Sequence, residues 1–570
     1  MNISISNFNY RIKVMGIKHF WIWFKQNHGN CILSLNKKTA SISSPIDTLA
    51  IDMNGIFHES AQKIYRYGKC APYRKRLLPR NERNLQKKFF IEVGKRVEFY
   101  RKMVSPEKKL ILCVDGVAGS AKMSQQRQRR FRVANTKGMP FNPNSLTPGT
   151  QIMDRLTFYL DWYIKTQVSF NPDWSNLQVI FSNEKVPGEG EHKIVNYMRT
   201  LSIPGEKVCI HGMDADLIML GLASPVKNVY ILRDDSFNED LIHFVDIDTV
   251  REGILNRVSP GGKKMRTVTD FVLMCYCVGN DFLPQIPGVE ILEGGIDSLL
   301  SSYEDLYDEF GPLSRSYRTH QHLCLTSFGV FLETMAELEK PMIDLKLSKR
   351  KSFFEDKILE SAIIEDTRGN RSIDIDRYKE EYYKQKFKGE NIEKVCHEYI
   401  KGMQWVLFYY TSGIPSWSWF YPWDYAPFIS DVAIHAKTYK SKKFPPDTPL
   451  SAFEQLITVL PPESASLIPK TLSPILSYDH PILGEFFPRE LVIDLGGKRR
   501  EWEGIVLLPK IDSKLFKKEY EKLISEVPES EARRNRRGKN FLYKYSDDSR
   551  YQKSYWGEAD FNCDRSFLIF

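Results

Sequence analysis

The sequence has no long hydrophobic run. Among its 570 residues, no apolar stretch approaches the roughly 18 residues that cross a bilayer, and the start, MNISISNFNYRIKV, lacks the apolar centre of a secretion signal. These absences speak against a membrane or secreted protein. We expect an intracellular protein, located in the cytoplasm rather than the nucleus, with no membrane partner.

Paired cysteines are missing as well. The nine cysteines are scattered, and the one close pair, Cys275 and Cys277, is spaced too closely for an ordinary disulfide or zinc motif. We therefore expect free, mostly buried thiols in a reducing compartment. The sequence also contains no internal repeat and no low-complexity tract.

The composition, 42% hydrophobic and 27% charged, is typical of a globular protein, and the length suits two or three domains. The 81 basic and 71 acidic residues give a net charge of +10. Strand-like and helical runs alternate up to about residue 302, which predicts an α/β fold with a mainly parallel sheet flanked by helices. We expect a catalytic domain over 15–339, a charged helical insertion or linker over 340–390, and a mostly helical second region over 391–570. The basic segment RRNRRGKNFLYKY near the end should be mobile at the surface.

Seven carboxylates lie in five short motifs, LAID, LCVD, GEGE, GMDAD and VGND. They are Asp52, Asp115, Glu189, Glu191, Asp214, Asp216 and Asp281. Three of the motifs follow the apolar runs 48–51, 110–114 and 208–211, which read as buried strands. Ligands of α/β sheets bind beyond the carboxyl ends of the strands, so these acids should gather in one crevice.

Each acid alone could be an ordinary turn or helix cap. Capping does not, however, select acids at every one of these strand ends. Carboxylates without histidine or cysteine partners favour Mg²⁺ or Mn²⁺ over zinc, and seven ligands suit two ions. Such ions serve phosphoryl transfer, so we expect hydrolysis of a phosphodiester.

A basic segment follows Asp115 directly. Residues 116–153 contain six basic side chains and no acidic one. If 121–134 is helical, one face carries Lys122, Gln126, Arg129 and Arg130. Such a face can be a solvated surface, but beside candidate metal ligands it suits a phosphate, because arginine makes bidentate contacts with phosphate oxygens.

Aromatic residues crowd the segment GIPSWSWFYPWDYAPF, where prolines prevent a regular helix. Its rings, including Trp417 and Trp419, could stack on nucleobases or pack two domains together. His58, six residues after Asp52, could likewise stack on a base or lie in the core.

Assembled in order, these motifs resemble the XRN family of 5′→3′ exoribonucleases, within the wider group of FEN and PIN-like nucleases. The first matching region contains MGIKHFWIWF, LAIDMNGIFH, CVDGVAGSAKMSQQRQRRFR, LTPGTQIMDRL, FSNEKVPGEGEHKIVNYMR, GMDADLIMLGL and FVLMCYCVGNDFLPQIP. The second contains YIKGMQWVLFYYTSGIPSWSWFYPWDYAP, FEQLITVLPP and EWEGIVLLP. The likeness spans most of 15–510 and points to a short member without the large C-terminal accessory domains.

The resemblance implies a set of roles. The seven carboxylates would hold catalytic Mg²⁺, and Lys122, Gln126, Arg129 and Arg130 would bind a 5′-monophosphate. His58 would stack on the terminal base, and Trp417 rather than Trp419 would help to draw the strand inward. A monomer would then degrade single-stranded, decapped or cleaved RNA processively to 5′-mononucleotides.

The sequence departs from the family pattern at several points. Fourteen residues precede Met15, and we expect 1–14 to be an extension; Lys18 and the Trp423-Asp424 pair also differ from the usual residues. Two alternatives remain: a FEN-like 5′ nuclease acting on DNA junctions, and an RNA-binding scaffold without catalysis. FEN-like enzymes have a helix-hairpin-helix with a Gly-x-Gly turn just after the last carboxylate, and PGVEILEGGI matches that turn poorly, which argues against the first alternative. The complete set of seven acids argues against the second, because binding alone does not require them.

Overall fold

The computed structural model describes residues 17, 19–39, 41–42, 44–71, 81–134, 139–235, 238–258, 266–317, 320–349 and 354–569. The expected extension at 1–14, together with Met15 and Lys18, lies outside the described residues. None of the helices in the described part is long and apolar enough to cross a membrane. The nine cysteines are free, and seven of them are buried, as expected.

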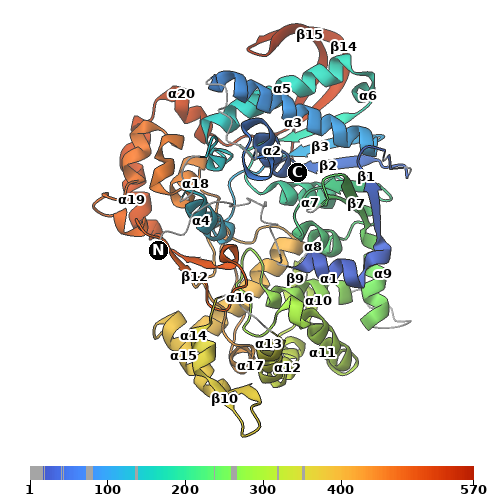
Figure 1. The fold of residues 1–570 in the computed structure, drawn as a ribbon. Coiled ribbons are helices and arrows are strands. Elements are labelled where there is room, and N and C mark those ends of the chain that lie inside the picture. Colours follow the sequence, from blue (N-terminus) through green and yellow to red (C-terminus); the bar gives the residue numbers. More distant parts are fainter. Residues whose placement is uncertain are drawn as a thin grey trace.

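A nine-stranded sheet forms the centre of the molecule, in the order β1-β7-β6-β5-β2-β3-β4-β14-β15 (Figure 1). The strands are β1 (Ile32–Asn36), β2 (Thr48–Asp52), β3 (Lys109–Cys113), β4 (Gln178–Ser182), β5 (Val208–His211), β6 (Val229–Asp234), β7 (Leu241–Asp246), β14 (Asn540–Ser554) and β15 (Gly557–Leu568). The five strands from β6 to β4 pair in parallel, and the strands on either side of them pair antiparallel. The predicted mainly parallel α/β sheet is confirmed.

Helices cover both faces of this sheet, because its inner strands are apolar on both sides. Leu49 and Ile51 face a core shared with three helices: α2 (Met53–Tyr65), α3 (Glu82–Val104) and α5 (Gln151–Phe170). Ala50 faces the opposite core. That core contains residues of α1 (Phe20–Asn27), α7 (Gly190–Thr200), α8 (Asp216–Ala223), α9 (Ile247–Val258), α10 (Thr267–Met274), α11 (Gly295–Phe310), α12 (Leu325–Glu337), α16 (Ile392–Thr411) and α17 (Ile429–Ala436).

The second region shares this core, since α16 contributes residues such as Trp405 and Tyr409 to it. A separate core joins α4 (Ser120–Ala134) to α18 (Ala452–Val459) and α19 (Ser513–Leu523). The helix that follows the first-region strand β3 therefore packs on second-region elements. Short hairpins complete the fold: β8 (Ser314–Tyr317) with β9 (His320–Leu323), and β12 (Val492–Asp494) with β13 (Ile505–Leu507).

The described residues within 340–390 form a packed unit of helices and a hairpin. Its elements are α13 (Glu339–Lys349), α14 (Lys357–Ser361), β10 (Ile363–Glu365), β11 (Arg371–Ile373) and α15 (Ile375–Phe387). Ile358, Ile373 and Tyr382 form its core together with Phe428 from the second region. The domain boundaries themselves stay a prediction.

The basic C-terminal segment differs from our expectation of a mobile surface tail. Its final residues begin β14, where Phe541 and Tyr543 pair with Phe181 and Val179 of β4 (Figure 1). The Tyr543 side chain is fully buried in the core beneath the sheet and donates a hydrogen bond to Asp161. Phe541 and Tyr543 thus extend the sheet beyond β4, and both are directed to the same core because every second side chain of a strand lies on the same face.

Candidate active site

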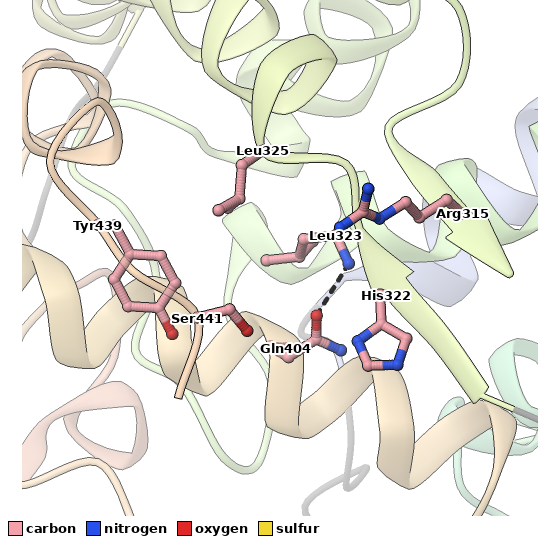
Figure 2. Close-up of a pocket in the computed structure, with 7 residues that line it drawn as sticks. All are labelled: Arg315, His322, Leu323, Leu325, Gln404, Tyr439 and Ser441. Carbon is pink, nitrogen blue, oxygen red and sulfur yellow. Dashed lines mark hydrogen bonds between the residues drawn. The ribbon is translucent and has the colours of Figure 1, made fainter. Parts of the chain in front are cut away.

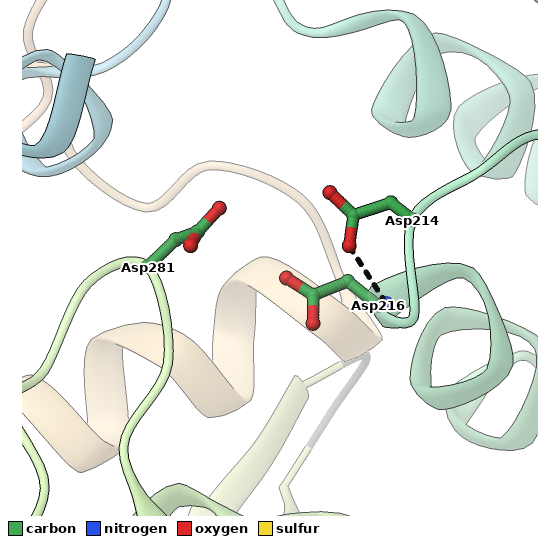
Figure 3. Close-up of side chains that lie close together, drawn as sticks. All are labelled: Asp214, Asp216 and Asp281. Atoms are coloured by element: carbon green, nitrogen blue, oxygen red, sulfur yellow. Dashed lines mark hydrogen bonds between the residues drawn. The ribbon is translucent and has the colours of Figure 1, made fainter. Parts of the chain in front are cut away.

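Three of the predicted acids form a compact cluster. Asp214 lies between β5 and α8, Asp216 is the first residue of α8, and Asp281 comes from the loop after a 3₁₀ turn at Cys275–Val278. One oxygen from each carboxylate lies within 4.8 Å of the other two, and Figure 3 shows Asp281 facing the pair from the opposite side. The cluster contains only oxygen donors, and their spacing fits a hard divalent cation such as Mg²⁺ or Mn²⁺.

The strand order explains why acids gather here. From β2 the chain adds β3 and β4 on one side and then β5 and β6 on the other, so the order reverses beside β2. Ligands of open α/β sheets bind at such a reversal. Asp52 ends β2, Asp115 follows β3, and Asp214 follows β5 at this edge.

Asp52, Asp115, Glu189 and Glu191 adjoin one another around the start of α7. The Gly190 N–H donates to Asp115 Oδ1 at 2.6 Å, and Asn54 Nδ2 donates to Asp115 Oδ2. A Cβ at Gly190 would lie 2.6 Å from Asp52 Oδ1, so only glycine allows this approach. Glu189 caps α7 and Glu191 lies in its first turn.

Burial and mutual repulsion raise the pKa of several of these acids. Burial raises the pKa of Asp214 to about 6, with Asp281 adding to the effect. Burial and the neighbouring Asp115 raise the pKa of Asp52, and burial and Asp214 raise that of Glu191. Crowded buried carboxylates of this kind need cations to remain ionised at neutral pH. The ligand role of all seven stays a prediction.

Lys122 provides one such cation. Its ammonium lies 2.7 Å from Glu189 Oε1 and 2.8 Å from Asp281 Oδ2, and the side chain is buried. Burial opposes its charge, but Asp281 and Glu189 outweigh burial and raise the pKa of Lys122. Gln125 of the same helix donates to Asp281 Oδ1 at 2.7 Å. The basic helix α4 is therefore attached directly to the acidic cluster.

The other predicted phosphate ligands follow Lys122 along α4. Arg130 donates to Thr147 Oγ1 and, at 3.3 Å, to Gln126 Oε1, and both Arg130 and Gln126 are buried. Arg129 is half-buried. Burial and the adjacent Arg129 lower the pKa of Arg130 to about 9, which marks a concentration of positive charge suited to an anion.

His58 on α2 lies beside these arginines. Burial, Arg129 and Arg130 lower the pKa of His58 to about 3, so the imidazole is neutral at physiological pH. A neutral ring next to a phosphate site can stack on a base without competing for the phosphate. This geometry is compatible with the stacking role, which stays a prediction.

The depressed pKa predicts an acid-sensitive stability. The unfolded chain protonates His58 near its ordinary value of 6.5 while the folded protein resists protonation, so stability is full above that pH and declines as the pH falls toward 3. At pH 5 the expected loss is about 2 kcal/mol, or roughly 2 °C in Tm. Thermal unfolding at pH 8 and pH 5 should show this extra loss in the wild type and not in His58→Gln. Equal losses in both proteins would contradict a neutral His58.

The two candidate tryptophans differ in their surroundings. Trp419 is 8% exposed and stacks on Trp405 with ring centroids 5.3 Å apart. Its ring is thus part of the core of the second region. Trp417 is half-buried, and within the described residues no aromatic ring packs on it. The prediction of a stacking tryptophan therefore narrows to Trp417.

Several neighbours of the cluster escaped the sequence analysis. Tyr409 of α16 donates its hydroxyl hydrogen bond to Glu189 Oε2, and its ring centroid lies 3.4 Å from that of His192. The run GMQWVLFYY reads only as an apolar helix, so nothing in it marks Tyr409 as a site residue. Asn54 could have been predicted more easily than Tyr409, because it is a polar residue two positions after Asp52, the acid that ends β2.

The second region also anchors α4 from behind. Arg127 donates to the Pro509 carbonyl at 2.6 Å and to the Phe486 carbonyl, and Arg132 donates to the Trp502 carbonyl at 2.6 Å. Arg127 and Arg132 thus bind main-chain carbonyls of the second region, whereas Arg130 of the same helix donates to Thr147 and Gln126. Two of the six basic residues in this segment hold the helix in place.

A small cavity of about 40 Å³ lies elsewhere, between α16, β9 and the segment after α17 (Figure 2). Gln404 at its wall accepts from the Leu323 N–H at 2.8 Å and donates to the Gln321 carbonyl at 3.2 Å. With its buried amide satisfied in this way, the cavity suggests no ligand.

Comparison with known proteins agrees with this architecture. The family description "XRN 5'-3' exonuclease N-terminus" matches residues 15–139 and 134–235, and "Xrn1 helical domain" matches 263–361 and 373–560. The human 5'-3' exoribonuclease 1 is 28% identical over 94% of this chain and 36% of its own length. The Drosophila melanogaster 5'-3' exoribonuclease 2 homolog is 28% identical over 95% of this chain and 74% of its own length.

A third relative, 5'-3' exoribonuclease 1 of Saccharomyces cerevisiae, is 26% identical over 88% of this chain and 43% of its own length. The chain thus spans between about a third and three quarters of these relatives. The helical-domain match alone covers half of the chain and follows the N-terminal match in the order expected from the motifs. The chain therefore belongs to the XRN family.

Proposed function

We propose that this protein is a 5′→3′ exoribonuclease that hydrolyses single-stranded RNA carrying a 5′-monophosphate. One observation carries the proposal: Lys122 binds Glu189 and Asp281 while the same helix presents Gln126, Arg129 and Arg130. The side chains that would recognise the 5′ end of the RNA thus lie on the same helix as Lys122, which contacts two of the acids that would hold the catalytic ions. The relatives named as 5'-3' exoribonucleases support this activity.

The seven carboxylates would hold Mg²⁺ or Mn²⁺, as two ions. Bound ions of this kind lower the pKa of a water molecule and stabilise the leaving oxygen. Side chains of the protein would hold the 5′-phosphate and the bases of the RNA in place. Arg129 and Arg130 would hold the 5′-phosphate, with Gln126 as a neutral donor, and His58 and Trp417 would stack on bases.

The proposed phosphate site would include the buried side chains of Gln126 and Arg130. We propose that it rejects a cap or triphosphate, so that decapped or cleaved RNA is the substrate. Each cut creates a new 5′-monophosphate, which can occupy the same site and sustain processive release of 5′-mononucleotides. We place this activity in a monomer in the cytoplasm.

The decisive test compares one RNA sequence with three 5′ ends: monophosphate, hydroxyl and cap. With Mg²⁺ present, the monophosphate form should be degraded about 10 to 100 times faster than the hydroxyl form, the range expected from hydrogen bonds to a charged group. The capped form should persist, and EDTA should stop all degradation. Equal rates on the three RNAs, or cuts in a circular RNA, would contradict the proposal.

A further inference from the structure

Asp447 binds the turn that carries Trp417. It lies in the loop between α17 and α18, thirty residues after Trp417 in sequence. Its Oδ1 accepts a hydrogen bond from the Trp417 N–H at 2.6 Å. Its Oδ2 accepts from Ser416 Oγ at 2.7 Å and from the Ser418 N–H and Oγ at 2.8 and 2.6 Å. One carboxylate thus receives four donors from three successive residues.

Two further bonds join this turn to the candidate active site. The Trp417 carbonyl accepts from the N–H of Ser120, the first residue of α4, at 2.7 Å. The Ser416 carbonyl accepts from Trp405 Nε1 at 3.0 Å. Ser120 lies two residues before Lys122, and Trp405 lies one helical turn before Tyr409. These bonds join the Trp417 turn to α4, which carries Lys122, and to α16, which carries Tyr409. Both of those side chains bind carboxylates of the candidate active site.

The Trp417 ring depends on this backbone for its position. Trp419, by contrast, is held by the rings of Trp405 and Phe444. In the described part of the chain no ring holds Trp417. A half-buried side chain whose main chain is held in place is a suitable stacking platform, because little conformational entropy is lost when a base binds.

We propose that Asp447 is a positioning residue that fixes Trp417 for stacking on the RNA strand. The inference rests on the proposed function. Hydrogen bonds to an ionised carboxylate are about twice as strong as neutral ones, so one side chain can hold the whole turn. Burial opposes the charge of Asp447, but the bonds from Ser418, Trp417 and Ser416 outweigh it and lower its pKa, which keeps the carboxylate ionised at neutral pH.

A double-mutant cycle tests the inference on the full-length protein. Trp417→Ala should lower kcat/KM on 5′-monophosphorylated RNA about 5- to 100-fold, the range of one lost stacking contact. Asp447→Ala should cause a similar loss, and Asp447→Asn, which retains the shape, a smaller one. In the Trp417→Ala background, Asp447→Ala should add less than about twofold, because its effect passes through Trp417. Asp376→Ala, an exposed acid on α15, is the control and should match the wild type.

Stacking itself can be measured with an RNA that carries the fluorescent base 2-aminopurine near its 5′ end. Binding to the wild type should quench the fluorescence of this base, and binding to Asp447→Ala should quench it much less. Multiplying losses in the double mutant, or unchanged kcat/KM in Asp447→Ala or Trp417→Ala, would overturn the inference. If Asp447→Ala unfolds, Asp447→Asn decides by the same cycle. A wild type that fails to degrade 5′-monophosphorylated RNA would instead contradict the proposed function, so the two failures are distinct.

Discussion

Asp214→Asn is expected to reduce the degradation rate at least about 10³-fold, because asparagine keeps the shape of the side chain and removes the charge that would hold a divalent cation. Asp214, Asp216 and Asp281 each have an oxygen within 4.8 Å of the other two, so the change alters one of three closely spaced carboxylates. Single-turnover rates on 5′-monophosphorylated RNA at saturating Mg²⁺ measure the effect.

The matched control is Asp376→Asn, which removes an exposed carboxylate from α15 and should leave the rate unchanged. Titration of Mn²⁺ followed by electron paramagnetic resonance should show weaker binding to Asp214→Asn and normal binding to the control. Residual activity within tenfold of the wild type would show that this cluster is not the catalytic metal site. Normal Mn²⁺ binding by Asp214→Asn would lead to the same conclusion.

The convergence of the acids could be predicted from sequence because parallel strands share a carboxyl edge. Once the runs before Asp52, Asp115 and Asp214 are read as buried strands, the fold leaves little choice about where those acids lie. The strands observed at Thr48–Asp52, Lys109–Cys113 and Val208–His211 agree with those runs. Short strands that are buried on both faces can be recognised in a sequence because they form short, continuous apolar runs.

Contacts between the two regions could not be predicted in this way. Tyr409 reaches Glu189 from a helix 220 residues further along the chain, and Asp447 reaches Trp417 from a loop that sequence shows only as proline-rich. Their partners are set by tertiary packing, which leaves no local periodicity. The same limitation applies to Phe541 and Tyr543, since a basic segment gives little sign that its aromatic residues join a sheet built from distant strands.

The basic helix shows a division of roles that composition alone conceals. Arg129 and Arg130 lie toward His58, whereas Arg127 and Arg132 bind carbonyls of the second region. Arg127 and Arg130, like Arg129 and Arg132, are three residues apart and lie on neighbouring parts of the helix surface, so their contacts rather than their spacing separate the two pairs. A charge count would treat all four arginines as equivalent phosphate ligands.

Replacement of both Arg129 and Arg130 by alanine should remove the preference for a 5′-monophosphate. Each arginine can donate charge-assisted hydrogen bonds to phosphate oxygens, and their joint loss should lower kcat/KM on the monophosphate substrate about 10- to 100-fold, the size of the preference itself. The slow reaction of the 5′-hydroxyl substrate should change little, because that substrate offers no phosphate to bind. The ratio of the two kcat/KM values should therefore fall toward one.

Arg132→Ala separates recognition from helix anchoring, because it removes a positive charge from the same helix without touching the phosphate ligands. We expect it to lower Tm and to preserve the ratio between monophosphate and hydroxyl substrates. Arg129→Ala alone should lower the ratio with little change in Tm, since Arg129 is half-buried. If Arg132→Ala abolished the preference while the double mutant at 129 and 130 retained it, the phosphate would bind on the opposite face of α4, and the direction of degradation would need another structural basis.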